Sequence, residues 1–266
     1  MAELKFTILG CGSSGGVPRL GGNWGECDPT NPKNNRRRCS MLVQRITDAG
    51  TTTVLIDTSP DMRNQLLDAN VGHIDAVIFT HAHADHTNGL DDLRQYVLMQ
   101  GAQIPIYADP MTKDALMERF NYAFVQVKGS IYPAILQMNT IQDDIIRING
   151  AGGEIEFMAF DVDHGAMTTK GFRIEDLAYI PDVVRIPDQT WPKLTGLDCW
   201  IIDALRRKPH KTHTHLSNTI EWIKQVKPKR AIITNMHVDL DYESVMAETA
   251  DNTGPAYDGL TRSYHL

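Results

Sequence analysis

A cluster of histidines at the end of an apolar run constrains the fold of this chain more than any other feature. The run Asp75–Phe79 is typical of a buried strand, and residues 80–86 follow it with the pattern H-x-H-x-D-H from His81 onward. Three imidazoles and a carboxylate therefore lie within six residues, although only 10 of the 266 residues are histidine. A lone histidine is usually satisfied by hydrogen bonds inside the protein, but this concentration favours a metal site.

The spacing within the pattern predicts how its ligands divide. Residues two apart in an extended segment point the same way, so His81 and His83 can bind one ion together. Where the backbone turns, Asp85 and His86 can reach a second ion. Imidazole combined with carboxylate suits zinc, iron or manganese and leaves coordination positions open for water.

Two ions need more ligands than one loop supplies, and further candidates follow apolar runs elsewhere in the chain. These candidates are His164, Asp182 and His237. A carboxylate such as Asp182 can bridge two cations, and a water held between them becomes hydroxide near neutral pH. We therefore expect two divalent metal ions, Zn2+ or Mn2+, and a hydroxide that attacks the substrate without any protein nucleophile.

Composition disfavours several other classes of protein. Lysine and arginine total 26 against 33 acidic residues, and the net charge of −7 disfavours binding to bulk nucleic acid or to an anionic membrane. No run of about 18 apolar residues is present, and the start of the chain lacks the pattern of an export signal. Four scattered cysteines without a C-x-x-C pair predict reduced thiols and a cytoplasmic protein.

Short strand-like runs alternate with helix-like segments, which predicts an α/β fold. The predicted strands are Lys5–Leu9, Thr53–Ile56, Ala76–Phe79, Ile104–Tyr107, Ile155–Phe160, Ala178–Ile180, Trp200–Ile202 and Ala231–Thr234. Helix starts are predicted at Ser59-Pro60, at Asp109-Pro110 and at Ser217. No repeat or long linker divides the chain, so we expect one domain over residues 1–266.

The complete pattern resembles that of the metallo-β-lactamase superfamily, in which H-x-H-x-D-H is followed by a distant His, Asp and His. The resemblance covers the whole chain and implies a four-layer αβ/βα sandwich. Several segments are similar to the PhnP-like branch of phosphodiesterases that act on cyclic phosphates. These segments are Gly10–Arg19, Arg36–Ser40, Asp85–Leu90, Thr214–Ser217 and Ala256–Gly259.

The resemblance implies a role for each matching residue. His81, His83 and His164 would hold the first metal, Asp85, His86 and His237 the second, and Asp182 would bridge the two ions. His215 would protonate the leaving group as a general acid, with His213 as the alternative. Asp57 resembles a carboxylate that orients a metal-bound imidazole, and the alternative is a cap of the turn before Pro60.

The resemblance is not complete. This branch often carries a C-x-C-x-x-C cluster that binds a structural zinc, whereas the matching stretch here has only Cys27. We therefore expect no separate structural zinc. The family also implies a homodimer.

Substrate recognition is predicted from the glycine-rich loop and a basic run. Backbone N–H groups of the Gly10–Gly16 loop, with Ser13 and Ser14, can approach phosphate oxygens, although a tight turn explains the glycines equally well. Arg38, in the run Arg36–Arg38, can clamp a phosphate, although such runs are often solvated turns.

The leading hypothesis is a dinuclear-metal phosphodiesterase that hydrolyses a small cyclic phosphate, of the phosphoribosyl 1,2-cyclic phosphate type, or a nucleotide phosphodiester. A ribonuclease Z-like enzyme is disfavoured by the negative charge and by the lack of a long basic insertion for gripping tRNA. A thioester or lactam hydrolase would need no phosphate site. A PqqB-like protein would keep the fold without ordinary hydrolysis.

Overall fold

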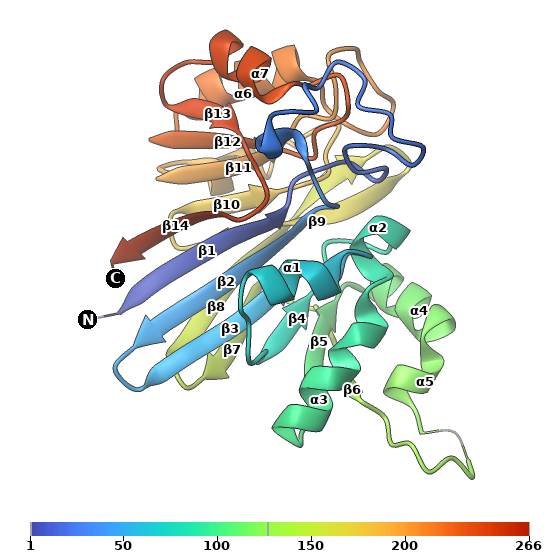
Figure 1. Ribbon diagram of the computed structural model, residues 1–266. Coiled ribbons are helices and arrows are strands. Elements are labelled where there is room, and N and C mark those ends of the chain that lie inside the picture. The colour runs from blue at the N-terminus through green and yellow to red at the C-terminus, as the bar shows by residue number, and fades with distance from the viewer. Residues whose placement is uncertain (1, 127, 266) are drawn as a thin grey trace. The chain divides into compact units, whose positions relative to one another are not determined.

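The computed structural model describes residues 2–126 and 128–265, and Figure 1 shows the arrangement of its elements. Contacts between Cα atoms divide the chain into two compact units. The first unit comprises Met1–Leu9, Ser40–Ile155 and Thr261–Leu266, and the second comprises Gly10–Cys39 and Glu156–Leu260. The expectation of a single domain stays a prediction.

The sheet of the first unit has seven strands in the order β14-β1-β2-β3-β4-β5-β6. Their bounds are Glu3–Gly10 (β1), Ser40–Thr47 (β2), Gly50–Ile56 (β3), Ala76–Ile78 (β4), Ile104–Ala108 (β5), Leu136–Thr140 (β6) and Leu260–His265 (β14). Strands β2 and β3 form an antiparallel hairpin, whereas β3, β4, β5 and β6 are parallel neighbours. Parallel strands place their carboxyl ends at one edge of a sheet, and in α/β proteins ligands bind at that edge.

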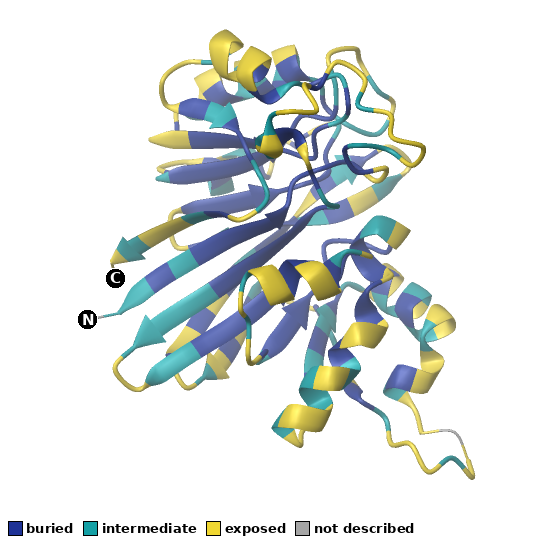
Figure 2. Cartoon of the chain, viewed as in Figure 1, coloured by how far each residue is buried: buried dark blue, intermediate teal, exposed yellow. Residues whose placement is uncertain are grey.

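Helices cover the parallel part of this sheet. They are α1 (Met62–Asp68), α2 (Ala84–Thr87), α3 (Arg94–Gln100), α4 (Pro110–Arg119) and α5 (Asn121–Phe124), with a 3-10 turn at Leu90–Leu93. Leu66 of α1 and Leu116 of α4 belong to one buried cluster with Val77 and Ile106 of the sheet. The strands are buried along most of their length and the helices expose their outer faces (Figure 2). Burial of these apolar faces is therefore what fixes the helices on the sheet.

The second sheet has the order β13-β12-β11-β10-β9-β8-β7. Its strands are Ile145–Gly150 (β7), Gly153–His164 (β8), Met167–Ile174 (β9), Leu177–Ile180 (β10), Cys199–Asp203 (β11), Arg230–Thr234 (β12) and Thr253–Pro255 (β13). In the second unit, α6 (Leu216–Val226) packs Ile223 against Trp200, Ile202 and Ala231. Strands β10 to β13 are parallel, so their carboxyl ends also share an edge. The remaining elements are α7 (Tyr242–Glu248) and 3-10 turns at Pro32–Asn34 and Trp191–Leu194.

The eight predicted strands all fall on strands of the two sheets, and the α/β class is confirmed. Asp109 caps α4 as predicted, because its carboxylate accepts hydrogen bonds from the N–H groups of Met111 and Thr112. The prediction at Ser217 is wrong by two residues: Thr219 N already donates to the carbonyl of His215, so the helix begins before Ser217. The four cysteines are buried, and none forms a disulfide among the described residues. Within the described residues, no helix has the length and apolar character needed to cross a membrane.

The end of α2 packs tightly against the turn after β3, and this contact gives a test of the fold. A Cβ atom on the buried Gly89 would lie 2.1 Å from the Ser59 carbonyl oxygen. We expect Gly89→Ala to lower the free energy of unfolding by about 1–3 kcal/mol, because the backbone must move to admit the methyl group. Gly72→Ala is the matched control, since nothing lies within 4 Å of its Cβ position. Urea denaturation of both variants checks the prediction, which equal losses of stability would contradict.

Candidate metal centre

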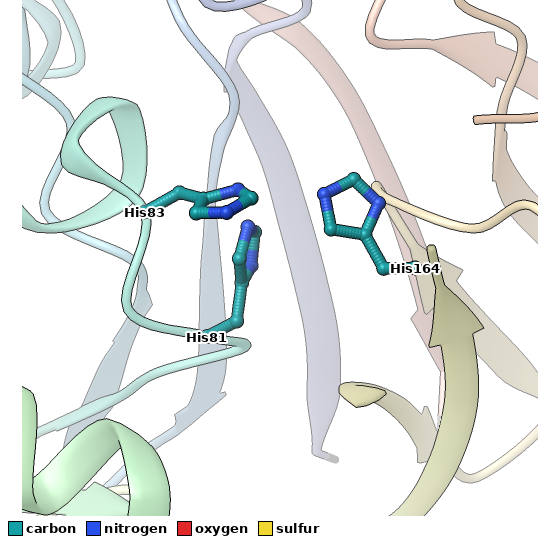
Figure 3. A group of neighbouring side chains, drawn as sticks. All are labelled: His81, His83 and His164. Carbon is teal, nitrogen blue, oxygen red and sulfur yellow. The ribbon is translucent and has the colours of Figure 1, made fainter. Parts of the chain in front are cut away.

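The first group of ligand candidates follows β4 in the first unit. His81 and His83 project from the loop between β4 and α2 with their rings close together, and Figure 3 labels them along with His164, the last residue of β8. The centroid of the His81 ring lies 4.6 Å from that of His83 and 4.3 Å from that of His86. Oδ2 of Asp85 lies 3.5 Å from Nε2 of His86. The short segment therefore gathers all four predicted ligands of this unit.

A buried carboxylate at the end of β3 organises this group. Asp57 is fully buried and has a positive φ of 63°. Its Oδ1 accepts the backbone N–H of Thr80 at 2.8 Å, and its Oδ2 accepts the Thr80 hydroxyl at 2.8 Å and His86 Nδ1 at 2.7 Å. Burial raises the pKa of Asp57, while His86 and the hydrogen bonds from Thr80 oppose the rise. One carboxylate thus fixes both the loop backbone and an imidazole.

These hydrogen bonds determine which ring nitrogens can bind a cation. A carboxylate accepts, so His86 must carry its proton on Nδ1. The Thr80 hydroxyl proton is used on Asp57, so the Thr80 oxygen accepts from His81 Nδ1, 2.9 Å away. Both imidazoles are therefore held with Nε2 as the atom that offers a lone pair.

The expectation that Asp57 contacts an imidazole of the pattern is confirmed by the 2.7 Å contact with His86. In the turn before Pro60, the capping contact comes from a different residue. The Ser59 hydroxyl accepts the N–H of Asp61 at 3.1 Å. A further anchor for the loop is Arg119 at the end of α4, whose guanidinium donates to the carbonyl of Ala82 at 2.5 Å.

The second group of ligand candidates lies in the second unit. His164 ends β8, and its Nδ1 lies 2.7 Å from the carbonyl of Thr212, which leaves Nε2 for a cation. Asp182 follows β10 and is buried. One potential ligand atom from each of His164, Asp182 and His213 lies within 4.8 Å of the other two. This unit therefore gathers two predicted ligands and one histidine that was predicted for catalysis.

A second buried carboxylate holds His213. Asp203, the last residue of β11, accepts His213 Nδ1 at 2.9 Å and the backbone N–H of Val183 at 3.0 Å through the same oxygen. Burial raises the pKa of Asp203 to about 7; His213 opposes this rise and the negative charge of Asp182 adds to it. Sequence reasoning missed Asp203, although a carboxylate at the end of an apolar strand was the available signal.

His237 follows β12 and lies between Arg19 and Asp239, and its assignment to the second metal stays a prediction. Its Nδ1 lies 3.0 Å from Asp239 Oδ1, and its Nε2 is hydrogen-bonded to the guanidinium of Arg19. In the described part of the chain, His237 belongs to no group of clustered ligand atoms. In the turn after β12, Asn235 adopts a positive φ of 60° and places its amide nitrogen 3.3 Å from Asp182 Oδ1.

His213 and His215 are separated by their surroundings. His213 contacts Asp203 and lies 3.6 Å from Asp182, whereas His215 occupies the capping position of α6 without a side-chain capping bond. Sequence spacing could not distinguish them, because residues two apart in an extended segment share a face. The role of general acid stays a prediction for both.

The predicted substrate-binding residues lie in the second unit. Ser13 is buried and its backbone N–H donates to the carbonyl of Met236 at 3.3 Å, whereas Ser14 is exposed. Arg38 forms an isolated β-bridge with Gly12, so it lies beside the glycine-rich loop. Their contact with substrate stays a prediction.

Comparison with known proteins identifies the family. The model of the β-lactamase superfamily domain matches residues 52–236. A crystal structure described as a new diphosphatase from the PhnP family is 34% identical, with a TM-score of 0.87, and the match covers 99% of this chain and 98% of that one. The Zn2+-bound PqqB of Methylobacterium extorquens is 21% identical with a TM-score of 0.72, over 97% of this chain and 99% of that one, and shows the fold alone.

A curated relative gives a different name. The octanoyltransferase of Porphyromonas gingivalis is 29% identical over 262 residues, which are 97% of this chain but 51% of that protein. The chain therefore spans about half the length of this relative. The family match and the full-length similarity confirm the predicted metallo-β-lactamase fold, and the chain belongs to the β-lactamase superfamily as a member related to the PhnP family.

Proposed function

We propose that this protein is a divalent-metal-dependent phosphodiesterase that hydrolyses a small cyclic phosphate, of the phosphoribosyl 1,2-cyclic phosphate type, or a nucleotide phosphodiester. The observation that carries this proposal is the 34% identity, along nearly the whole chain, to a diphosphatase of the PhnP family. The matched family region, residues 52–236, includes both groups of ligand candidates. Metal dependence is supported further by the zinc bound in the related fold of PqqB.

The donor set fits divalent cations. We assign to them the side chains of His81, His83, Asp85, His86, His164 and Asp182. Hydrogen bonds at Nδ1 leave Nε2 as the ligand atom of His81, His86 and His164. Mixed imidazole and carboxylate ligands suit zinc or manganese. When bound, such cations would polarise the phosphoryl oxygens and supply an activated water.

His213 is the general acid in this proposal, in preference to His215. Asp203 holds Nδ1 of His213, which leaves Nε2 to donate a proton. An alkoxide is a poor leaving group, so a proton delivered to its oxygen lowers the barrier to bond cleavage. His215 has no comparable carboxylate partner in the described parts of the chain.

Acyl transfer is the second candidate, because the octanoyltransferase match covers 97% of this chain. The match includes only 51% of that protein, so its activity cannot be assigned to the matched half. A thioester substrate therefore belongs in the test of function.

The metal-loaded protein is expected to hydrolyse phosphodiesters and to lose this activity on chelation. The panel comprises bis(p-nitrophenyl) phosphate, 2′,3′-cyclic nucleotides, phosphoribosyl cyclic phosphate, a pre-tRNA and an octanoyl thioester. Metal content is quantified on the same samples, and activity is restored with Zn2+ or Mn2+. Turnover of the thioester alone would reject the phosphodiesterase, and turnover of the pre-tRNA alone would favour tRNA processing.

Asp57→Asn is expected to weaken metal binding about 10- to 100-fold, because the amide no longer fixes the tautomers of His86 and, through Thr80, His81. Competition with a chromophoric chelator measures the affinity. Asp75→Asn is the control, since this carboxylate accepts the Thr53 N–H at 2.7 Å and a histidine at 3.1 Å away from the ligands. Equal metal affinity in the Asp57 variant and the wild type would refute the positioning role.

His213→Asn is expected to retain its metal and to lose activity in proportion to the basicity of the leaving group. Hydrolysis of an alkyl ester should fall about 100-fold or more, and hydrolysis of a p-nitrophenyl ester much less, because nitrophenolate leaves without a proton. His215→Asn is the matched control. Loss of bound metal from the His213 variant would instead make His213 a ligand, and equal losses on both esters would remove it from acid catalysis.

A further inference from the structure

A rare backbone conformation occurs directly after one parallel strand of each unit. Within residues 2–126 and 128–265, the non-glycine residues with positive φ are Asp57, Asn70, Glu175, Lys227 and Asn235. Asp57 and Asn235 are buried and immediately follow β3 and β12, whereas the other three are exposed. Side chains other than glycine adopt this conformation infrequently, and such residues cluster at functional sites. Asp57 orients His86, so the buried Asn235 calls for a comparable explanation.

Two oxygen atoms determine how the side-chain amide of Asn235 is oriented. Its Nδ2 lies 2.9 Å from the carbonyl oxygen of Pro181 and 3.3 Å from Asp182 Oδ1. Because a carbonyl and an ionised carboxylate only accept, each of the two amide protons is directed at one of these oxygens. Strand β11 lies between β12 and β10 in the sheet, so the amide reaches across the end of β11 to the segment after β10. Asn235 therefore donates to a side chain that we assign to the cations.

The same amide influences which carboxylate His213 contacts. His213 Nδ1 lies 2.9 Å from Asp203 Oδ2 and 3.6 Å from Asp182 Oδ1, so two carboxylates are near one imidazole proton. The amide nitrogen of Asn235 lies 3.2 Å from His213 Nδ1 and donates to the Asp182 oxygen instead. Since Asp182 Oδ1 thus accepts from Asn235, the pairing of His213 with Asp203 is favoured.

Other residues hold the backbone on either side of the Asp182 carboxylate. The Asp182 carbonyl accepts the Thr169 hydroxyl at 2.9 Å, and the N–H of Val183 donates to Asp203 at 3.0 Å. The carbonyl of Val183 accepts the N–H of Thr214. Loss of the Asn235 amide should therefore release the rotation of the carboxylate while these contacts keep the main chain in place.

We propose that Asn235 is a positioning residue of the metal centre, whose amide fixes the rotation of the Asp182 carboxylate and so presents this ligand to a cation in one orientation. The inference rests on the metal-dependent function proposed for this protein and deepens it. A neutral amide suits this role, because it donates a hydrogen bond without a positive charge that would repel the cation. Asparagine also tolerates the left-handed conformation better than most other residues.

The binding test makes the same substitution at two asparagines with similar backbone conformations. Asn235→Gly removes the amide and keeps the positive φ, which glycine adopts readily. Competition with a fluorescent zinc chelator should show Zn2+ binding about 10- to 100-fold weaker than in the wild type. Asn70→Gly, at an exposed residue with a φ of 52° after α1, is the matched control and should bind Zn2+ normally. Unchanged affinity in Asn235→Gly would overturn the proposal.

A spectroscopic test separates positioning from a merely structural role. Co2+ replaces zinc as the probe, because its ligand-field absorption reports the arrangement of the ligands. The spectrum should change in Asn235→Gly and in Asn235→Asp, which keeps the shape of the side chain but cannot donate to Asp182 when ionised. The Asn70→Gly spectrum should match that of the wild type. A lower melting temperature of the metal-free variants with unchanged Co2+ spectra would assign Asn235 to stability alone and overturn the proposal.

A double-mutant cycle tests whether Asn235 acts through Asp182. Asn235→Gly should weaken Zn2+ binding much less in an Asp182→Asn background than in the wild type, because the carboxylate that it orients is gone. Equal effects in both backgrounds would overturn the proposal. These measurements use no substrate, so they separate the inference from the proposed function: a protein that shows these effects but hydrolyses no phosphodiester would refute the function and leave the role of Asn235 standing.

Discussion

The hydrogen bonds to Asp57 are the interaction on which the first group of ligand candidates depends. This carboxylate, at the end of β3, accepts hydrogen bonds from the backbone N–H and hydroxyl of Thr80 and from His86 Nδ1. The Thr80 oxygen in turn accepts from His81 Nδ1, which fixes the tautomer of that imidazole as well. The Ser40 hydroxyl in turn donates to the carbonyls of Ile56 and Asp57. A fully buried carboxylate must have its hydrogen-bond donors in place. The tautomers of the imidazoles therefore depend on the same hydrogen-bond network that holds the end of β3 and the turn after it.

The second unit uses the same principle with different residues. Asp203 ends β11 and Asp182 follows β10, so two neighbouring parallel strands deliver carboxylates to one edge of a sheet. Asp203 orients His213, and its raised pKa of about 7 reflects the cost of burying charge beside Asp182. In both units, a carboxylate at the end of a strand, Asp57 or Asp203, orients an imidazole by a hydrogen bond.

The strands and the local ligand cluster were predictable because their signals are local. Apolar runs mark the strands, and the pattern H-x-H-x-D-H places four candidate ligands within six consecutive residues. The contacts of His237 were not predictable, because they include a hydrogen bond from Arg19, 218 residues away. Likewise, the choice between His213 and His215 depends on Asp203, which only the sheet brings beside His213.

The buried side chain of Arg36 has a consequence for how the glycine-rich loop keeps its shape. This guanidinium connects Cys27, Asn34 and the carbonyl of His237. None of these three partners is a side chain that we assign to the cations, so the cross-link does not depend on bound metal. Stripping cations from the ligand side chains should therefore leave the loop intact, so that the shape of the loop and loading with metal are separable properties of one protein.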